Sequence, residues 1–573
     1  MSGPVKVDVL VVGSGAAGLS AAVTAAMHGA SVMVAEKASV LGGTSAWSGG
    51  WLWIPRNPLA RAEGIDEAAD APLTYLQHEM GGEAADIRLQ TFLRYGPEMV
   101  EFFHQRTAVQ FLSGSAMPDF HPSPGAANGG RSVTAQPYDG RLLGDWLHRL
   151  RPPLETISLG GMGIAGGADM AHFFNATRSP RSALYAARRL LRHGWQRLRA
   201  GRGQHLVNGN ALVARLLRSA LDAGVRFQLN APVVRLLQGP PGVSGAVLRS
   251  DGGEIHVEAG AVVLACGGFP HDRQRLAQVV PHAAEGYGHF SAAPPDNQGE
   301  GIRLGESVGG QFNTSLRHPL AWAPVSRVTL ASGQQLMFPH LVERAKPGVI
   351  AVLPNGKRFV NEADSYHDFI AALLAATPAG DTPQAWLLAD RRTLRRYGLG
   401  HARPFPFPPT AWLRTGYLQR GNTLAELAKQ CAIDANALAE TVERFNHFAS
   451  AGEDVDFHRG ASAYNRAQGD HQVTLGPLRE GPFYAVRILP GSLGTFSGLQ
   501  TDEHARVLDE QQQPIPGLYA IGNDMSSVMR GYYPSGGITL GPAMTFGYLV
   551  GKNLAKKTNI NNNIVLFPRM DAP

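Results

Sequence analysis

A glycine-rich turn between a short apolar strand and a helix constrains the fold of this chain more than any other feature. Residues 8–12 (DVLVV) form a short, mainly apolar run rich in β-branched residues, which is typical of a buried parallel strand. The sequence GSGAAG follows at once and places Gly13, Gly15 and Gly18 in the G-x-G-x-x-G pattern. A helical stretch and a second strand come next, and that strand ends at Glu36. This spacing predicts a Rossmann-type dinucleotide-binding unit.

Each residue of this unit has a physical role toward a dinucleotide. Gly13 permits a tight turn, Gly15 lets the backbone approach a pyrophosphate, and Gly18 lets the helix pack on the strand. The N-terminus of the helix presents free N–H groups to the phosphates, and Glu36 would accept hydrogen bonds from ribose hydroxyls. The alternative is a glycine turn without a ligand. The predicted cofactor-binding residues here also include Ala16, Ala17 and Lys37.

A second glycine-rich loop, LGGTSAWSGG, distinguishes FAD from NAD. Its glycines and hydroxyls suit close approach to a second nucleotide half. The predicted cofactor-binding residues in it are Gly42, Gly43, Thr44, Ser45, Ser48, Gly49 and Gly50. On these motifs the chain resembles the flavoprotein family that includes fumarate reductases and 3-oxosteroid dehydrogenases, in which this loop lies along FAD. Because the loop contains no histidine or cysteine, we expect FAD to be bound non-covalently.

The resemblance extends over most of residues 6 to 555 and implies further cofactor contacts. They fall in the strand near residue 233, in the turn of GAVVLACGGF, in GLYAIGND and in the C-terminal GGITLGPAM. Cys266, in the second of these stretches, is expected to be a small buried residue rather than a nucleophile. The additional residues implied to bind FAD are Val233, Gly267, Gly522, Asn523, Gly537, Thr539 and Leu540.

The chain has 573 residues, enough for two large domains. From about residue 285 the strand–helix rhythm gives way to a stretch rich in Pro, His and aromatic residues. The resulting prediction is an α/β fold, a Rossmann-type FAD-binding domain with an inserted α+β substrate domain. The predicted boundaries are 1–285 for the first part of the FAD-binding domain, 286–480 for the substrate domain, 481–560 for the second part of the FAD-binding domain and 561–573 for a tail.

Cysteine content and hydropathy suggest a cytoplasmic protein. Cys266 and Cys431 are the only cysteines, so no disulfide framework is expected. The first strand begins by Asp8, which leaves no room for a cleavable signal peptide. The sequence contains no run of about eighteen apolar residues, so no membrane span is expected. No haem, iron–sulfur or other metal motif is present, so we expect no metal.

The net charge of +6 is concentrated in one segment. Residues Arg178 to Arg202 contain eight arginines and no acid, and they also carry Leu184, Leu191, Trp195 and Leu198. This pattern predicts a basic amphipathic helix. It either lies on an anionic membrane surface, which would make the protein peripheral to the inner face of the membrane, or forms a solvated face of the protein. No nucleic-acid-binding module accompanies the patch, so no nucleic-acid partner is expected.

The substrate site is predicted from two tyrosine motifs. NGKRFVNEADSY resembles a stretch in which fumarate reductases place an arginine proton donor, and here Tyr366 stands in that place. The stretch YPSGG resembles the Y-P-x-x-G signature of 3-oxosteroid 1-dehydrogenases. In that group the tyrosine hydroxyl and the last glycine's N–H bind the substrate ketone. The resemblance thus implies that Tyr533 and Gly537 bind a carbonyl and that Tyr366 abstracts the neighbouring proton.

One position departs from the family pattern. In the resembled dehydrogenases a second tyrosine assists the proton-abstracting one, because a free phenol has a pKa near 10. The matching residue here is Phe120, in PDFHPSPGAANGG, and it lacks the hydroxyl. The adjacent His121 either substitutes for it or is structural.

Three functions are compatible with these motifs. The first is FAD-dependent α,β-dehydrogenation of a hydrophobic cyclic ketone, a 3-ketosteroid or a steroid-like compound. The second is an ene-reductase acting on an enone or enoate, for which Arg530 is either the anchor of an acidic group or an exposed surface arginine. The third is an electron-transfer subunit, which would need neither Tyr366 nor Tyr533. We expect a hydrophobic small-molecule substrate and a separate electron acceptor, whose identity the sequence leaves open.

Overall fold

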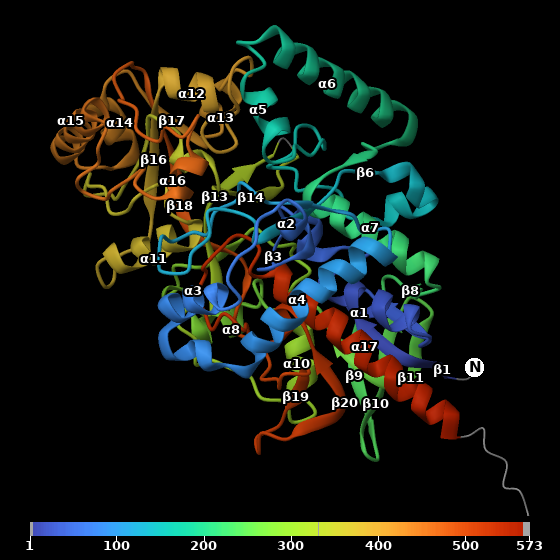
Figure 1. The fold of residues 1–573 in the computed structure, drawn as a ribbon. Helices are drawn as coiled ribbons and strands as arrows, with labels where there is room; N and C mark the ends of the chain where they lie inside the picture. The colour runs from blue at the N-terminus through green and yellow to red at the C-terminus, as the bar shows by residue number, and fades with distance from the viewer. Residues whose placement is uncertain (1–3, 331, 565–573) are drawn as a thin grey trace, which may run out of the picture.

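The computed structural model describes residues 4–330 and 332–564, and two sheets organise it (Figure 1). The first sheet has the strand order β19-β20-β11-β1-β2-β8, and β10 and β9 continue from β11 as an antiparallel ribbon. Its central strands are parallel, as the glycine fingerprint predicts. The strands are β1 (Val5–Val12), β2 (Val32–Ala35), β8 (Arg226–Gln228), β9 (Val233–Gly239), β10 (Gly242–Ser250), β11 (Gly253–Leu264), β19 (Arg506–Leu508) and β20 (Pro514–Ala520).

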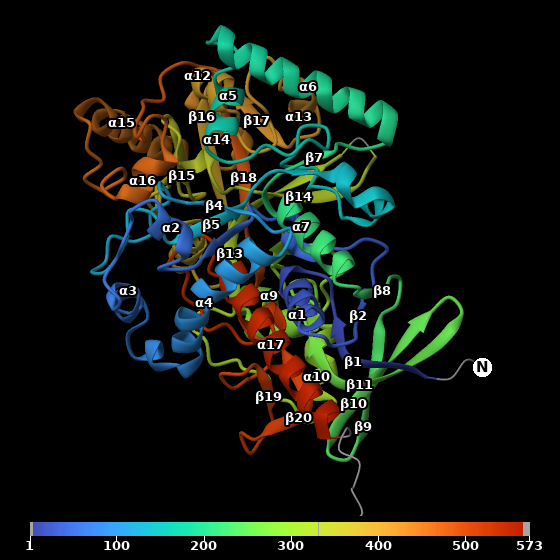
Figure 2. The same cartoon turned by 45° about the vertical axis from the view of Figure 1, so that its right-hand side comes forward.

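Helices α1 (Ala16–Met27) and α17 (Leu540–Ile564) pack side by side against this sheet (Figures 1 and 2). Their close contact depends on glycine, because a side-chain carbon at Gly547 would lie 2.6 Å from the Ala17 carbonyl oxygen. The predicted tail begins at residue 561, but α17 continues through Ile564, and the rest of the tail lies outside the described residues.

The second sheet forms a cap above the first. Its order is β14-β13-β18-β16-β15, with β12 and β17 also paired to β18, and nearly all of its pairs are antiparallel. Together the two sheets confirm the predicted fold class. The strands are β12 (Phe290–Ser291), β13 (Leu320–Thr329), β14 (Gln335–Pro339), β15 (Val349–Val352), β16 (Ala385–Asp390), β17 (Leu418–Gly421) and β18 (Phe483–Thr495).

The predicted return to the FAD-binding domain at Gly481 is too early. Strand β18 hydrogen-bonds to β13 and β16 in the centre of the capping sheet. The chain pairs with the first sheet again only at β19.

The remaining elements complete the fold around the two sheets. The small strands are β3 (Trp51–Trp53), β4 (Phe111–Ser113), β5 (Ser132–Ala135), β6 (Tyr138–Asp139) and β7 (His205–Leu206). The remaining α-helices are α2 (Pro58–Ala62), α3 (Ala71–Met80), α4 (Ile87–Arg106), α5 (Ala168–Phe174), α6 (Pro180–Ala200), α7 (Asn208–Asp222), α8 (Arg273–Val279), α9 (Pro281–Ala284), α10 (Glu300–Glu306), α11 (Tyr366–Ala376), α12 (Arg391–Tyr397), α13 (Thr410–Arg414), α14 (Leu424–Cys431), α15 (Ala435–Ala451) and α16 (Ala463–Gln468). The 3₁₀ helices are η1 (Gly43–Trp47), η2 (Gly81–Ala85), η3 (Gly140–Arg149), η4 (Glu343–Ala345) and η5 (Gly522–Asp524).

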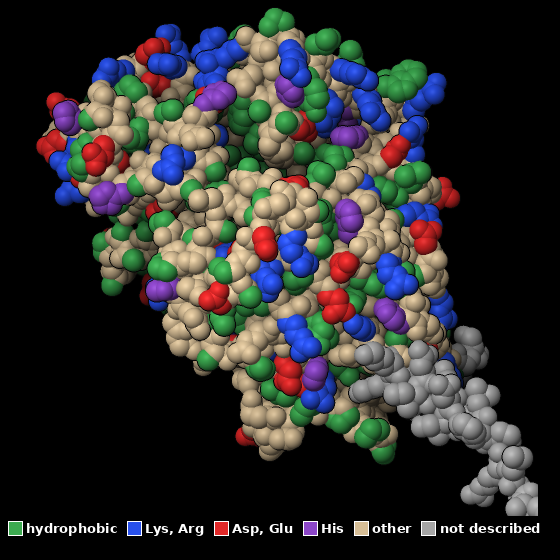
Figure 3. Space-filling model, in the orientation of Figure 1, with side chains coloured by type: hydrophobic (Ala, Val, Ile, Leu, Met, Phe, Trp, Pro, Cys, Tyr) green, Lys and Arg blue, Asp and Glu red, His purple; other side chains and the backbone are tan. Residues whose placement is uncertain are grey.

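Helix α6 is the predicted basic amphipathic helix, and it lies along the upper edge of the molecule (Figures 1 and 2). Figure 3 shows Lys and Arg side chains along this edge, with apolar side chains among them. Leu184, Leu191 and Leu198 are 72%, 76% and 85% exposed, and their spacing places them on one face of the helix. Among the described residues, no helix is both long and apolar enough to span a bilayer.

Candidate active site

The glycine fingerprint forms the turn between β1 and α1. Gly13 has a φ of +107°, and a side-chain carbon there would lie 2.2 Å from the Ala265 carbonyl oxygen. At Gly18 such a carbon would lie 2.1 Å from the Gly13 oxygen. At Gly15 it would meet only the Ser45 hydroxyl, at 3.5 Å, so this backbone is open to the cavity beside it. Gly13 and Gly18 are therefore required by packing, whereas Gly15 leaves room for a ligand to approach.

Glu36 stands at the end of β2 and faces the same turn. Its carboxylate accepts hydrogen bonds from the Ser14 hydroxyl (2.5 Å), the Ser14 amide (3.2 Å) and the Ala38 amide (2.9 Å). Lys37 forms an ion pair with Glu300 on α10. The carboxylate is thus fixed in orientation at the position where a ribose is expected. The fingerprint alone does not identify Ser14, because its position is variable in the pattern.

The second glycine-rich loop forms η1 and adjoins the first turn. The Ser45 hydroxyl accepts a hydrogen bond from the Ala16 amide (3.0 Å), which ties η1 to the start of α1. Asn297 donates to the Thr44 hydroxyl (3.0 Å) and to the Gly267 carbonyl oxygen (3.1 Å), so it joins this loop to the turn after β11. Asn297 could not be predicted from the sequence, since it lies in no recognisable motif.

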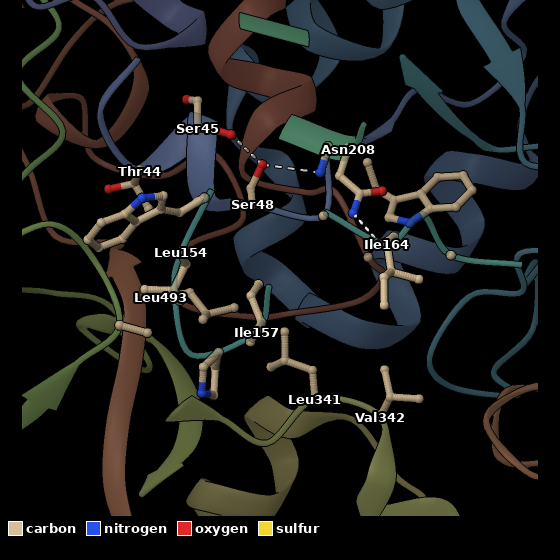
Figure 4. A pocket seen from close by; sticks show the side chains of 18 of the residues that line it. Thr44, Ser45, Ser48, Leu154, Ile157, Ile164, Asn208, Leu341, Val342 and Leu493 are labelled. Atoms are coloured by element: carbon tan, nitrogen blue, oxygen red, sulfur yellow. Dashed lines mark hydrogen bonds between the residues drawn. The ribbon is translucent and has the colours of Figure 1, made fainter. Parts of the chain in front are cut away.

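One cavity of about 1330 Å³ joins these loops to the cap. Figure 4 shows the hydroxyl side chains of Thr44, Ser45 and Ser48 on one side of it and Ile157, Leu341 and Val342 on the opposite side. Gly18 and Gly42 are not among its lining residues, since both are enclosed by protein atoms. The predicted cofactor-binding residues that do line it are Gly13, Gly15, Ala16, Ala17, Glu36, Lys37, Gly43, Thr44, Ser45, Ser48, Gly49, Gly50, Val233, Gly267, Gly522, Asn523, Gly537, Thr539 and Leu540.

Tyr366 and Tyr533 meet inside this cavity. Tyr366 begins α11, and its hydroxyl donates a hydrogen bond to the Tyr533 hydroxyl at 2.8 Å. Burial raises the pKa of Tyr366 well above its ordinary value. Burial also raises the pKa of Tyr533, to about 12, while hydrogen bonding with Tyr366 and Thr539 opposes that rise. Both phenols are therefore protonated and neutral near neutral pH when no ligand intervenes.

Gly537 packs tightly against the backbone of β3. Its φ is +99°, and a side-chain carbon there would lie 2.6 Å from the Trp53 amide nitrogen. The Trp53 amide donates to the Gly537 carbonyl oxygen (3.1 Å), so the turn is fixed to β3. Within the described chain the Gly537 amide has no acceptor, and it lines the cavity. Gly537 and Tyr533 thus line the same cavity, and the Gly537 amide is left as a free backbone donor.

Phe120 is buried at the centre of an aromatic cluster. Its ring stacks on Tyr533 (5.7 Å between centroids), meets Tyr366 edge-on (5.6 Å) and contacts Tyr464 (4.5 Å). Tyr464, on α16, also lines the cavity, and burial raises the pKa of its phenol. Sequence reasoning missed Tyr464, because it lies in no motif and only the packing of α16 on Phe120 brings it here.

His121 does not reach the tyrosine pair. Its Nδ1 is 2.5 Å from a Glu79 oxygen, and its Nε2 is 2.8 Å from an Asp368 oxygen. Hydrogen bonds to Asp368 and Glu79 raise its pKa to about 10 against the opposing effect of burial. The imidazolium thus joins α3 to α11, and both of its nitrogens are occupied. This arrangement favours the structural interpretation of His121 over an assisting role.

Arg530 is directed away from the cavity. Its Nε is 2.7 Å from a Glu83 oxygen, and the residue is not among those lining the cavity. The hypothesis that Arg530 anchors an acidic substrate group is therefore wrong, because its guanidinium is paired on another surface.

Comparison with known proteins agrees with this geometry. Residues 8–540 match the family described as "FAD binding domain", and the chain belongs to that family. It is an FAD-dependent oxidoreductase acting on CH–CH groups. It is 40% identical to the 4-oxocyclohex-2-ene-1-carboxylate 5-dehydrogenase of Sinomonas cyclohexanicum, over 97% of this chain and 95% of the relative. It is 36% identical to the 3-oxosteroid 1-dehydrogenase of Mycolicibacterium smegmatis, over 96% and 97%.

A solved structure shares the whole fold. It is the 3-ketosteroid delta1-dehydrogenase of Sterolibacterium denitrificans in complex with 1,4-androstadiene-3,17-dione. The TM-score is 0.87 at 36% identity, and the match covers 96% of this chain and all of the other.

The tyrosine pair can be tested by removing one hydroxyl at a time. Tyr366→Phe and Tyr533→Phe should each slow anaerobic flavin reduction by about two to three orders of magnitude, the range for a lost acid–base group or oxyanion donor. The wild-type rate should rise from about pH 7 to pH 10, because the phenolate fraction of Tyr366 rises with pH. Stopped-flow absorbance of the flavin measures both effects.

Tyr532→Phe is the matched control, since Tyr532 adjoins Tyr533 in sequence but does not line the cavity. FAD content should be unchanged in all three variants. Near-normal flavin reduction in both Tyr366→Phe and Tyr533→Phe would contradict the assignment of this site.

The role of Phe120 can be tested by Phe120→Tyr, for which we expect a decrease in kcat/KM. Rings of Tyr366, Tyr464 and Tyr533 surround it, so a hydroxyl added by Phe120→Tyr should be left unpaired at a cost of about 1–3 kcal/mol. We expect kcat/KM on the best substrate to fall about 5- to 100-fold. If Phe120→Tyr is faster than wild type at neutral pH, a phenol at position 120 assists Tyr366, and the expectation of an unpaired hydroxyl is wrong.

Proposed function

We propose that the protein introduces a double bond next to the carbonyl of a hydrophobic cyclic ketone, a 3-ketosteroid or a steroid-like compound. The observation that carries this proposal is the Tyr366–Tyr533 hydrogen bond in a cavity that also contains the flavin-binding loops. Relatives at 36% and 40% identity are named for a steroid and for a single-ring ketone carboxylate. A cyclic ketone is the chemical class that both names share.

The chain's own residues account for the activation of the ketone. The Tyr533 hydroxyl and the Gly537 amide donate hydrogen bonds to the ketone oxygen and stabilise the negative charge that develops on it. This makes the neighbouring C–H group acidic. Tyr366 accepts the proton that leaves it in its phenolate form, after its own hydroxyl proton has passed to solvent. Bound FAD supplies the acceptor for the hydride from the next carbon. The apolar side chains opposite the hydroxyl loop exclude water from the ring system.

We also propose that FAD is bound non-covalently. Residues 43–50 contain no histidine or cysteine that could carry a covalent link. Cys266 lines the cavity, but burial raises the pKa of its thiol. That makes it a poor nucleophile.

The function is tested by flavin reduction without oxygen. The purified protein should be yellow and should release free FAD on denaturation. Under anaerobic conditions, 3-ketosteroids or smaller cyclic ketones should bleach the flavin and yield the α,β-unsaturated product, identified by mass spectrometry. If no cyclic ketone in the panel bleaches the flavin, the proposal fails. Return of the yellow colour when an enone is added to the chemically reduced enzyme, without bleaching by any saturated ketone, would indicate an ene-reductase.

We further propose that α6 binds the anionic inner face of the cytoplasmic membrane. The exposed leucines share a face with Trp195, and arginines flank them. On another side of the same helix, Ala183, Ala187 and Leu190 line the cavity. A hydrophobic substrate dissolved in the bilayer would thus be close to the site.

Vesicle co-sedimentation tests this contact. Wild type should sediment with phosphatidylserine-containing vesicles, and less so at high salt. The double variant Leu191→Glu/Leu198→Glu should weaken binding about tenfold or more, because each inserted leucine is worth about 1.5–3 kcal/mol. Val455→Glu changes an exposed side chain outside α6 and is the matched control. Equal sedimentation of the double variant and wild type would contradict the contact.

A further inference from the structure

The cations lining the cavity divide into two pairs. Lys37 and Arg151 lie near the flavin-binding loops, and each forms an ion pair, with Glu300 and Asp296 respectively. The other two cations, Lys346 and Arg403, belong to the cap. In the described part of the chain, no carboxylate lies within ion-pair distance of either of them.

Lys346 is compensated by a helix end. Its ammonium donates to the carbonyl oxygens of Gln468 (2.6 Å) and Gly469 (2.8 Å), at the C-terminus of α16. That end of a helix carries partial negative charge, so the lysine is a cap for α16. Burial nevertheless lowers the pKa of Lys346, to about 8.

Arg403 has no comparable partner. Its guanidinium donates to a single acceptor, the Ser158 carbonyl oxygen, although a guanidinium has five N–H donors. Burial lowers its pKa, with no acid opposing the effect. The loop that carries it is held in place, because His401 Nδ1 is 2.8 Å from the Thr156 carbonyl oxygen. Arg403 is therefore a fixed cation with unused donors on the cavity wall.

The carboxylates on the same wall are already engaged. Glu343 contacts His340 (2.5 Å), and Asp470 accepts from Arg396 (2.6 Å) and from Tyr397 (2.7 Å). Neither can neutralise Arg403 without leaving its own partner unpaired. A partly desolvated guanidinium without a counter-charge is unfavourable, and a bound carboxylate would remove that penalty through bidentate hydrogen bonds.

We propose that the substrate is a cyclic ketone bearing a carboxylate, and that Arg403 binds this carboxylate. The inference rests on the proposed function, since it assigns the ketone to Tyr533 and the acidic group to a different part of the same cavity. The apolar side chains of Leu341 and Val342, which precede Lys346 in the cap, would contact the ring system between them. Arg403 then selects acidic ketones over neutral ones of the same shape.

Matched acid and ester substrates test this selection. The probes are 4-oxocyclohexanecarboxylate and a 3-ketosteroid with a side-chain carboxylate, each compared with its methyl ester in anaerobic flavin reduction. Wild type should prefer one acid over its ester. Arg403→Gln should lower kcat/KM for that acid about 10- to 100-fold, mainly through KM, and leave the ester unchanged.

Two further variants separate binding from folding. Arg403→Lys keeps the charge but not the fork geometry, so it should retain part of the acid preference. Arg414→Gln removes the same charge from an exposed position on α13 outside the cavity and should change neither substrate. FAD content and the melting temperature of each variant verify that it is folded.

The outcomes distinguish the two levels of the proposal. If wild type reduces its flavin equally well with acid and ester, or if Arg403→Gln slows both equally, the carboxylate subsite is wrong while the ketone dehydrogenase stands. If no acid and no ester reduces the flavin, both proposals are overturned.

Discussion

The contact between Gly13 and Ala265, at the carboxyl ends of β1 and β11, is the constraint on which the rest of the structure depends. A side chain at Gly13 would collide with the Ala265 carbonyl oxygen, and the Gly13 amide donates to the Ala35 carbonyl oxygen at 2.8 Å. The ends of three parallel strands are thereby brought together. The loops that follow them open into one cavity, as expected at the carboxyl edge of such a sheet.

Buried polar contacts link the FAD-binding domain to the turn that contains Tyr533. Asp119 accepts from Trp53 Nε1 (2.8 Å) and from Arg131 (2.7 Å), beside the segment that supplies Phe120. Tyr75 donates to the Pro534 carbonyl oxygen at 2.6 Å. Because these groups are buried, losing one partner would leave the other uncompensated. The turn that aims Tyr533 is thus held from the FAD-binding side.

The cap positions Tyr366 by a separate set of charges. Glu362 is fully buried and accepts from Arg358 and Arg459, and these cations lower its pKa to about 2. This group fixes the segment that leads into α11. Two independently stabilised layers therefore place one phenol each, and the site exists only where the layers meet.

The sequence by itself determined the elements whose geometry is local. The strand, glycine turn and helix of the fingerprint, the basic helix α6 and the motifs around Tyr366 and Tyr533 could all be predicted, because backbone conformation follows from residue type and spacing. Only the tertiary structure decided which side chains meet. It placed Tyr464 against Phe120, enclosed His121 between two carboxylates, turned Arg530 away and left Arg403 unpaired on the cavity wall. Each of these outcomes depends on partners distant in sequence, and the packing that brings them together leaves no periodic or local signal in the chain.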